Sequence, residues 1–276
     1  MHKYILGLAI FITGIYVAYV VVVDEPQPIS DVPSVSYEDV QNVESVEDVD
    51  SDQHVEEVND STKPEAGSTP TTDAPESETG IEEGEPLPAQ FNLAVPFTPQ
   101  APHANWALPY GETCEEASAY MVSEYYKGTP SGLIQPAIAD QAILDIVDFQ
   151  EDFLGYYLDT TASETVSFMD AYYGVFATVI TDPTVTMIKA EIAAGRPVIL
   201  PAAGRELGNP NFTGEGPLYH MLVIKGYTED QFITNDPGTR NGENYLYDID
   251  VLMAAMGDWN NGDPANGAKV VIFTQP

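Results

Sequence analysis

Positive charge is scarce in this sequence. Only 9 of the 276 residues are Lys or Arg, against 44 Asp or Glu, and the formal net charge at pH 7 is −35. Proteins that bind nucleic acids neutralise backbone phosphates with clustered Lys and Arg side chains. The sequence has no such cluster, so we expect no nucleic-acid partner.

Cysteine and histidine are also rare, with one Cys and four His in the chain. A single Cys excludes an intrachain disulfide and any zinc site that needs several thiolates. Four His leave few candidate metal ligands, and we expect no metal site.

Long apolar runs are limited to residues 4–23, which hold twenty uncharged, mostly apolar side chains. As a helix this run spans about 30 Å, the hydrocarbon thickness of a bilayer. Lys3 precedes it and Asp24 follows, which favours a cytoplasmic N-terminus and export of the rest. The sequence therefore predicts a single-pass transmembrane anchor over 1–23 and an extracytoplasmic C-terminal domain. A cleaved signal peptide, giving a secreted protein, is the alternative.

Residues 24–90 are acidic and poor in aromatic side chains. They contain 20 Asp or Glu, one Lys and one aromatic residue, Tyr37, with frequent Pro, Ser and Thr. Such a composition buries too little apolar surface to offset the entropy of the chain. It predicts a disordered acidic linker that tethers the domain after it.

Residues 91–276 carry the remaining periodic segments, and their number suits a single domain. The spacing of apolar residues predicts helices over 113–126, 135–147, 163–172, 184–194 and, for a short one, 248–256. Alternating or continuous apolar runs predict strands over 93–97, 197–202, 220–227, 231–236 and 269–274. Helices that precede antiparallel strands are typical of the α+β class.

Cys114 falls at the predicted start of a helix. Thr113 and Glu116 form the pattern of a capping box, which places Cys114 in the first helical turn. The helix dipole there favours a thiolate, and a lowered pKa is what a cysteine nucleophile requires. Glu112 and Glu115 oppose ionisation of the thiol, so a histidinium partner is needed. A buried structural cysteine is the alternative.

Three further polar residues are candidates for the same site. His220 begins an apolar strand, and Asp236 ends the next strand, where a hairpin brings it near enough to orient the imidazole. Gln100 lies upstream in a polar loop, and its amide is suited to stabilise an oxyanion together with the Cys114 N–H. The alternatives are a core histidine, a turn aspartate before Pro237 and a surface glutamine.

Six sequence blocks occur together in a recognisable order: VPFTPQ (95–100), NW (105–106), ETCEEASAYMVSEYY (112–126), GRPVILP (195–201), YHMLVIKGY (219–227) and ITNDPGT (233–239). Over residues 91–276 the chain resembles the stand-alone, extracytoplasmic relatives of the bacteriocin-processing cysteine peptidases, bacterial enzymes of family thirty-nine with a papain-like fold. The resemblance implies Cys114 as nucleophile, His220 as general base, Asp236 as orienting acid and Gln100 as oxyanion donor.

The resemblance implies N-terminal helices packed on a C-terminal antiparallel sheet. It also implies a membrane-tethered thiol hydrolase that cleaves peptide or amide bonds in a peptide or protein substrate, with a Cys-His-Asp triad and no metal or organic cofactor. We expect a monomer. A non-catalytic module that binds peptides or cell-wall stems, and a papain-like acyl transferase, are the alternatives. The loop 202–219, rich in Gly and Pro, suits a lid or cleft wall, or equally a passive surface loop.

Overall fold

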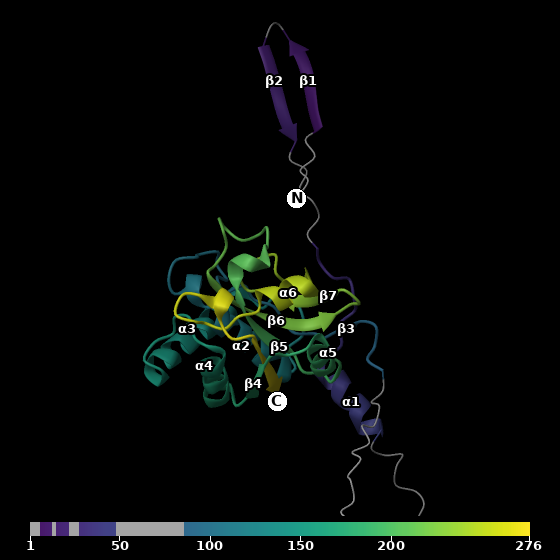
Figure 1. Ribbon diagram of the computed structural model, residues 1–276, viewed down its shortest axis with the longest axis vertical. Helices are drawn as coiled ribbons and strands as arrows, with labels where there is room; N and C mark the ends of the chain where they lie inside the picture. The colour runs from purple at the N-terminus through teal and green to yellow at the C-terminus, as the bar shows by residue number, and fades with distance from the viewer. Residues whose placement is uncertain (1–5, 13–14, 22–27, 48–85) are drawn as a thin grey trace, which may run out of the picture.

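The structure is a computed structural model that describes residues 6–12, 15–21, 28–47 and 86–276 (Figure 1). At the N-terminus, β1 (Leu6–Ile12) and β2 (Ile15–Val21) pair as an antiparallel hairpin. These strands stand where the sequence predicts a membrane-spanning helix. The physical reason lies in their composition, because β-branched and aromatic residues such as Ile, Val, Phe and Tyr favour strands.

The rest of the predicted anchor, residues 1–5, 13–14 and 22–23, lies outside the described residues. In the described part of the chain, no helix combines the length and the apolar character needed to cross a bilayer. Membrane attachment therefore stays a prediction from the sequence.

The core of the domain is one antiparallel sheet with the strand order β4-β9-β5-β6-β7-β8, to which β3 adds by pairing with β6. The strands are β3 (Phe91–Asn92), β4 (Phe176–Thr181), β5 (Val198–Ala203), β6 (Tyr219–Tyr227), β7 (Gln231–Asn235), β8 (Tyr245–Asp248) and β9 (Val270–Gln275). Sequence reasoning missed β4 and β8, which lie at the two ends of this order. Both are partly exposed, so neither has the continuous apolar run of the buried strands β5 and β6.

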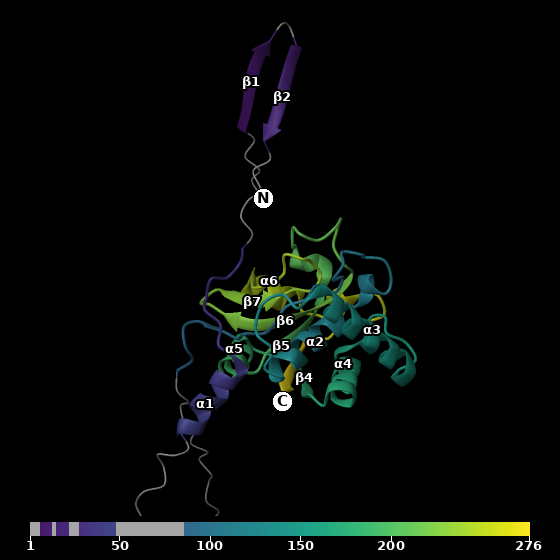
Figure 2. The same cartoon turned by 180° about the vertical axis from the view of Figure 1, so that it is seen from behind.

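Helices cover this sheet and confirm the predicted α+β class. They are α2 (Cys114–Tyr126), α3 (Pro136–Phe153), α4 (Ala162–Phe168, continuing into a π-helical turn at Met169–Tyr173), α5 (Val185–Ala193) and α6 (Ile249–Ala255). Short 3-10 turns lie at Tyr110–Glu112, Gly204–Leu207 and Pro264–Asn266. Figure 2 shows α2, α3 and α4 gathered on one side of the sheet.

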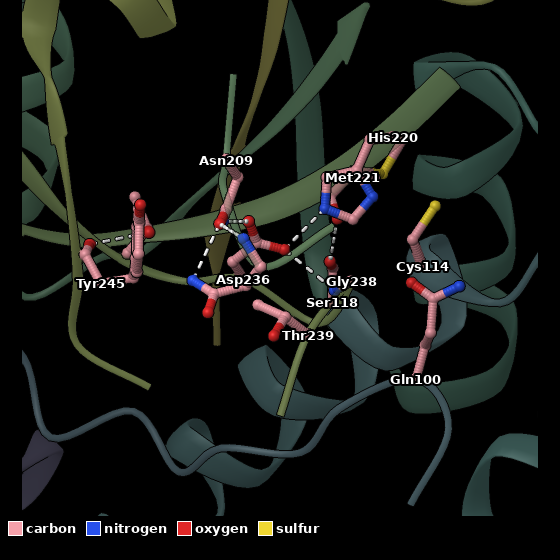
Figure 3. Close-up of polar contacts among 12 residues, drawn as sticks. Gln100, Cys114, Ser118, Asn209, His220, Met221, Asp236, Gly238, Thr239 and Tyr245 are labelled. Atoms are coloured by element: carbon pink, nitrogen blue, oxygen red, sulfur yellow. Dashed lines mark hydrogen bonds and ion pairs between the residues drawn. The ribbon is translucent and has the colours of Figure 1, made fainter. Parts of the chain in front are cut away.

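The central helix α2 runs through the core, and every residue in it except Glu124 and Tyr126 is buried. It packs on β6 and on α3. Near its start, the Ser118 hydroxyl donates to the Met221 carbonyl at 3.2 Å. This contact holds the N-terminal part of α2 against the start of β6, where Cys114 lies near His220 (Figure 3).

The predicted capping box at the start of α2 is wrong. The Thr113 side chain makes no capping hydrogen bond, and its hydroxyl donates instead to the carbonyl of Gln100 at 3.2 Å. Glu116 turns into the core and accepts a hydrogen bond from Gln150 of α3. Partners from other segments thus replace the local bonds that the pattern of residues suggested.

Residues 28–47 pack on the domain and are called the N-terminal strap from here on. The backbone N–H of Val35 donates to the carbonyl of Asn92 at 2.9 Å, and the N–H of Ala94 donates to the carbonyl of Val35 at 2.7 Å. The Asn92 side chain donates to the carbonyl of Val32 at 2.8 Å. The strap is therefore tied to the segment around β3 by hydrogen bonds in both directions.

The strap ends in a helix, α1 (Tyr37–Glu47), that lies beside α5 (Figures 1 and 2). The Tyr37 ring contacts Tyr125 and Tyr126 of α2 edge-on, with centroids 5.4 and 5.3 Å apart. Val40 is buried against Gly195, where a Cβ added to the glycine would approach the valine to 2.5 Å. A side chain at position 195 would therefore displace α1.

The predicted disorder of the linker 24–90 is wrong for the strap and for residues 86–90, which the structure also describes. The linker is acidic on average, but it contains three apolar side chains that pack on the domain core: Val35, Tyr37 and Val40. Residues 24–27 and 48–85 of the predicted linker lie outside the described residues.

Deleting residues 1–47 should destabilise the domain, because Tyr125 and the Asn92 amide lose their cover. We expect a loss of about 2 kcal/mol or more in the free energy of unfolding, from the burial of aromatic and aliphatic side chains. Deleting only residues 1–27 is the matched control and should change stability little. Thermal unfolding measures both, and equal melting temperatures for the two deletions would contradict this role of the strap.

Candidate active site

His220 and Asp236 meet at the adjoining ends of β6 and β7. His220 is the second residue of β6, and the two strands run antiparallel with Asn235 opposite Val223, so Asp236 arrives near the start of β6. The Nε2 atom of His220 lies 2.7 Å from Oδ1 of Asp236. Both side chains are buried, with 1% and 0% exposed. The predicted hairpin thus brings the imidazole and the carboxylate together.

Both oxygens of Asp236 are held by hydrogen bonds. Besides His220 on Oδ1, the donors are the Gly238 N–H to Oδ1 at 2.9 Å, the Asn209 amide to Oδ2 at 3.1 Å and the Tyr247 hydroxyl to Oδ2 at 2.6 Å. Burial alone would raise the pKa of Asp236, but the imidazole and these donors outweigh it and hold the pKa below its ordinary value. Asp236 is therefore an ionised, fixed partner for His220.

Cys114 is the first residue of α2, and 5% of it is exposed. Figure 3 shows the His220 ring between Asp236 and Cys114. Because Nε2 is hydrogen-bonded to Asp236, Nδ1 is the ring nitrogen that remains to interact with the sulfur. In the described structure the thiol hydrogen bond goes to Oε2 of Glu115 at 3.0 Å.

The lowered thiol pKa that the helix position suggested is not found. Burial, followed by the charge of Glu115 and its hydrogen bond, raises the pKa of Cys114 well above its ordinary value. A backbone hydrogen bond from Met221 opposes this rise but does not outweigh it. The helix dipole is a small effect beside the removal of the thiolate from water and a carboxylate at contact distance.

Gln100 lies beside Cys114 (Figure 3). Its N–H donates to the carbonyl of Pro237 at 2.9 Å, and its carbonyl accepts from Thr113, so its backbone joins the Asp236 loop to the start of α2. Its side-chain amide donates one hydrogen to the carbonyl of Tyr110 at 2.9 Å. Its Oε1 atom is buried and makes no hydrogen bond within the described residues.

Gln100, Cys114, His220 and Asp236 thus come together from separate segments of the chain. Within the described ranges, no group of three or more His, Cys, Asp or Glu side chains is placed to hold a metal ion.

A cleft of about 760 Å³ opens next to Gln100. Aromatic side chains of Trp106 and Phe212 lie in its walls, together with residues 111–112, 211–213, 216–217 and 238–241. Residues 211–213 and 216–217 of the predicted loop 202–219 therefore form a wall of the cleft. The Phe212 ring also meets the His220 ring edge-on, with centroids 5.4 Å apart.

Gly238 lines the cleft and lies directly against the imidazole of His220. A Cβ at this position would lie 2.8 Å from Cε1 of His220 and 2.8 Å from the Phe212 ring. Only glycine leaves room for the imidazole at its present position.

Sequence reasoning missed three residues that support the site: Asn209, Phe212 and Tyr247. Asn209 donates to Asp236 and also to the Tyr247 hydroxyl, at 2.7 Å. The Gly- and Pro-rich setting of the first two gave a hint of a cleft wall. Tyr247 gave no signal, because it lies on the edge strand β8 that the pattern did not reveal.

Replacing Tyr247 with phenylalanine should lower kcat about tenfold, equivalent to about 1.4 kcal/mol, with little change in KM. The loss follows from the missing donor to Oδ2 of Asp236, which lets the carboxylate and the imidazole reorient. Tyr245→Phe is the matched control, because it removes a hydroxyl from the same strand while leaving the donors to Asp236 in place. Steady-state kinetics of the two variants check this, and equal effects would contradict it.

A family model described as the Peptidase C39-like family matches residues 92–263, which is more than half of the chain. The four candidate residues all lie inside this range. None of the curated proteins compared with the chain matches it. Among solved structures, a crystal structure of a candidate C39-like peptidase from Bacillus anthracis is similar at 15% sequence identity, with a TM-score of 0.44. The similarity covers 68% of this chain and 98% of that one.

Proposed function

The chain belongs to the Peptidase C39-like family, and from this premise we propose that it is a thiol hydrolase that cleaves peptide or amide bonds. The observation that carries the proposal is the position of His220, hydrogen-bonded to Asp236 through Nε2 and lying between that carboxylate and Cys114. This is the order that nucleophilic catalysis by cysteine requires, with the base next to the nucleophile and an acid that orients the base.

In the proposed reaction, Nδ1 of His220 takes the thiol proton and Sγ of Cys114 attacks the substrate carbonyl. The oxyanion that forms accepts hydrogen bonds from the Gln100 amide and the Cys114 N–H at the start of α2. The C–N bond then breaks as the imidazolium gives its proton to the leaving amine, which leaves a thioester on Cys114. His220 next removes a proton from water, the hydroxide attacks the thioester, and the thiol is restored with release of the carboxylic acid.

The test uses the full chain, a mixture of fluorogenic peptides and iodoacetamide. Because Cys114 is the only cysteine, one adduct by mass spectrometry reports its modification without peptide mapping. We expect hydrolysis to fall in proportion to the alkylated fraction. Fully alkylated protein that hydrolyses peptides at the original rate would overturn the proposal, and transfer of the acyl group to an added amine in place of water would assign a transferase.

We also propose that the domain acts outside the cytoplasm, tethered through the N-terminal segment. The support comes from the sequence, where the apolar residues 4–23 follow Lys3 and precede the acidic Asp24 and Glu25. Adding a protease to intact cells should degrade the domain, and the protein should sediment with membranes. A domain that survives until the cells are lysed would contradict this location.

A further inference from the structure

The thiol of Cys114 has an unexpected partner for a nucleophile. Its Sγ atom lies 3.0 Å from Oε2 of Glu115, and this residue is 1% exposed. The proposed reaction assigns no role to Glu115. A carboxylate in contact with the sulfur opposes formation of the thiolate, so its position needs a separate explanation.

Glu115 is buried and forms no ion pair with any residue that the structure describes. The ion pairs among the described residues involve other carboxylates. Its second oxygen, Oε1, is buried and makes no hydrogen bond there. An isolated buried carboxylate is costly unless it is protonated or hydrogen-bonded. The thiol of Cys114 keeps its proton and donates a hydrogen bond to Oε2.

We propose that Glu115 is a catalytic residue that holds the thiol proton of Cys114 in the substrate-free enzyme and keeps the sulfur turned away from the imidazole. The inference deepens the proposed function and rests on it for its catalytic meaning. A rotation of the sulfur about its Cα–Cβ bond, away from Glu115 and toward Nδ1 of His220, then activates the nucleophile when a substrate fills the cleft. Until then the resting thiol reacts slowly with small electrophiles.

The groups around Cys114 and Glu115 favour the state in which the thiol keeps its proton. Burial raises the pKa of Glu115 to about 8, and the hydrogen bond with the thiol opposes that rise. The groups that face the pair from neighbouring segments are Glu112 before α2, Glu116 within it, Asp159 before α4 and Tyr219 of β6. The His220 ring of β6 lies on the Cys114 side of the pair (Figure 3). His220 carries the only basic side chain in this set. A thiolate is therefore stabilised only where the sulfur meets the imidazole.

The test measures the rate of alkylation of the full chain by iodoacetamide, without substrate, from weakly acid to alkaline pH. In Glu115→Gln the shape of the side chain is kept and its charge removed. We expect the midpoint of the pH profile to fall by about one unit or more, and the rate at neutral pH to rise about threefold for each unit, since a lower pKa also weakens the nucleophile. A side chain with only a structural role would leave the midpoint unchanged.

Glu116→Gln is the matched control, because it removes a buried carboxylate from the same helical turn whose hydrogen bond goes to Gln150 and not to the sulfur. Its shift should be clearly smaller. Equal shifts in the two variants, or an unchanged midpoint in Glu115→Gln, would overturn the proposal. If circular dichroism shows that Glu115→Gln does not fold, Glu115→Asp decides, because the shortened carboxylate loses the contact and should shift the midpoint in the same direction.

Failure of this inference and failure of the proposed function give different results. Alkylation needs no substrate, so a shifted midpoint in a protein that hydrolyses no peptide would support the Glu115 contact and refute the hydrolase. Peptide hydrolysis with an unchanged midpoint would do the reverse.

Discussion

Replacing Cys114 with alanine should abolish peptide hydrolysis while the fold stays intact. The substitution removes the sulfur that forms the thioester, and no other thiol exists in the chain to replace it. Loss of a nucleophile in enzymes of this type costs about 10³-fold or more in kcat. The side chain lost is small, so we expect the free energy of unfolding to change by only about 1 kcal/mol.

Ser123→Ala is the control for this variant. Ser123 is buried on the same helix, and its hydroxyl donates to the Tyr120 carbonyl at 2.9 Å, away from the site. It should lose a little stability and keep its activity. Hydrolysis measured with a fluorogenic peptide, together with circular dichroism, compares the two variants. Activity in Cys114→Ala that matches the wild-type protein would end the hydrolase proposal.

Replacing Asp236 with asparagine should lower kcat by about 10²–10⁴-fold, as loss of the orienting carboxylate does in other catalytic triads. In asparagine, an NH₂ group replaces one of the two carboxylate oxygens. It cannot accept the hydrogen bonds that Asn209, Gly238 and Tyr247 donate to both oxygens in the wild-type protein. The imidazole then loses both its orientation and the charge that stabilises its protonated form. Steady-state kinetics measure the loss, and a variant that keeps more than a tenth of the wild-type kcat would contradict the role of Asp236.

Asp248→Asn is the matched control, because Asp248 is exposed and its carboxylate accepts a hydrogen bond from the Gln231 amide at 3.0 Å.

The pH dependence of stability also distinguishes Asp236→Asn from the wild-type protein. The folded-state pKa of Asp236 is lowered, so its stabilising contribution is present above the ordinary aspartate pKa of about 4 and is lost as the pH falls through the folded value. Asp236→Asn should therefore be less stable than wild type at neutral pH, with a difference that shrinks in acid.

The sequence predicted the parts of the site that depend on local pattern. The apolar run after His220 and the turn residues Asn235-Asp236-Pro237 marked two strands of a hairpin, and the structure joins them as predicted. The resemblance assigned the orienting role to Asp236 and not to its neighbour Asn235. The structure turns the Asn235 amide to the carbonyls of Val95 and Pro96, and only Asp236 reaches His220.

What the sequence did not predict depends on contacts between distant segments. The strap 28–47 is acidic on average, and only its packing on Tyr125 and Gly195 reveals that it is ordered. The helix begins after Thr113 as the pattern predicted, but the Thr113 hydroxyl donates to the carbonyl of Gln100, so the predicted capping box does not form. The thiol pKa is raised and not lowered, mainly because the sulfur is buried and secondly because Glu115 contacts it directly. The sequence named Glu115 as an opposing charge, but it could show neither the burial nor the contact.

The most direct test of the central claim is to trap the thioester on Cys114. An activated peptide ester makes deacylation the slow step, so an acyl-enzyme accumulates and is preserved by acid quenching. Mass spectrometry of the quenched full chain should find one acyl group, carried by the peptide that contains Cys114, with a burst of product of equal amount. Continued turnover with Cys114 unmodified at every time point would contradict the account.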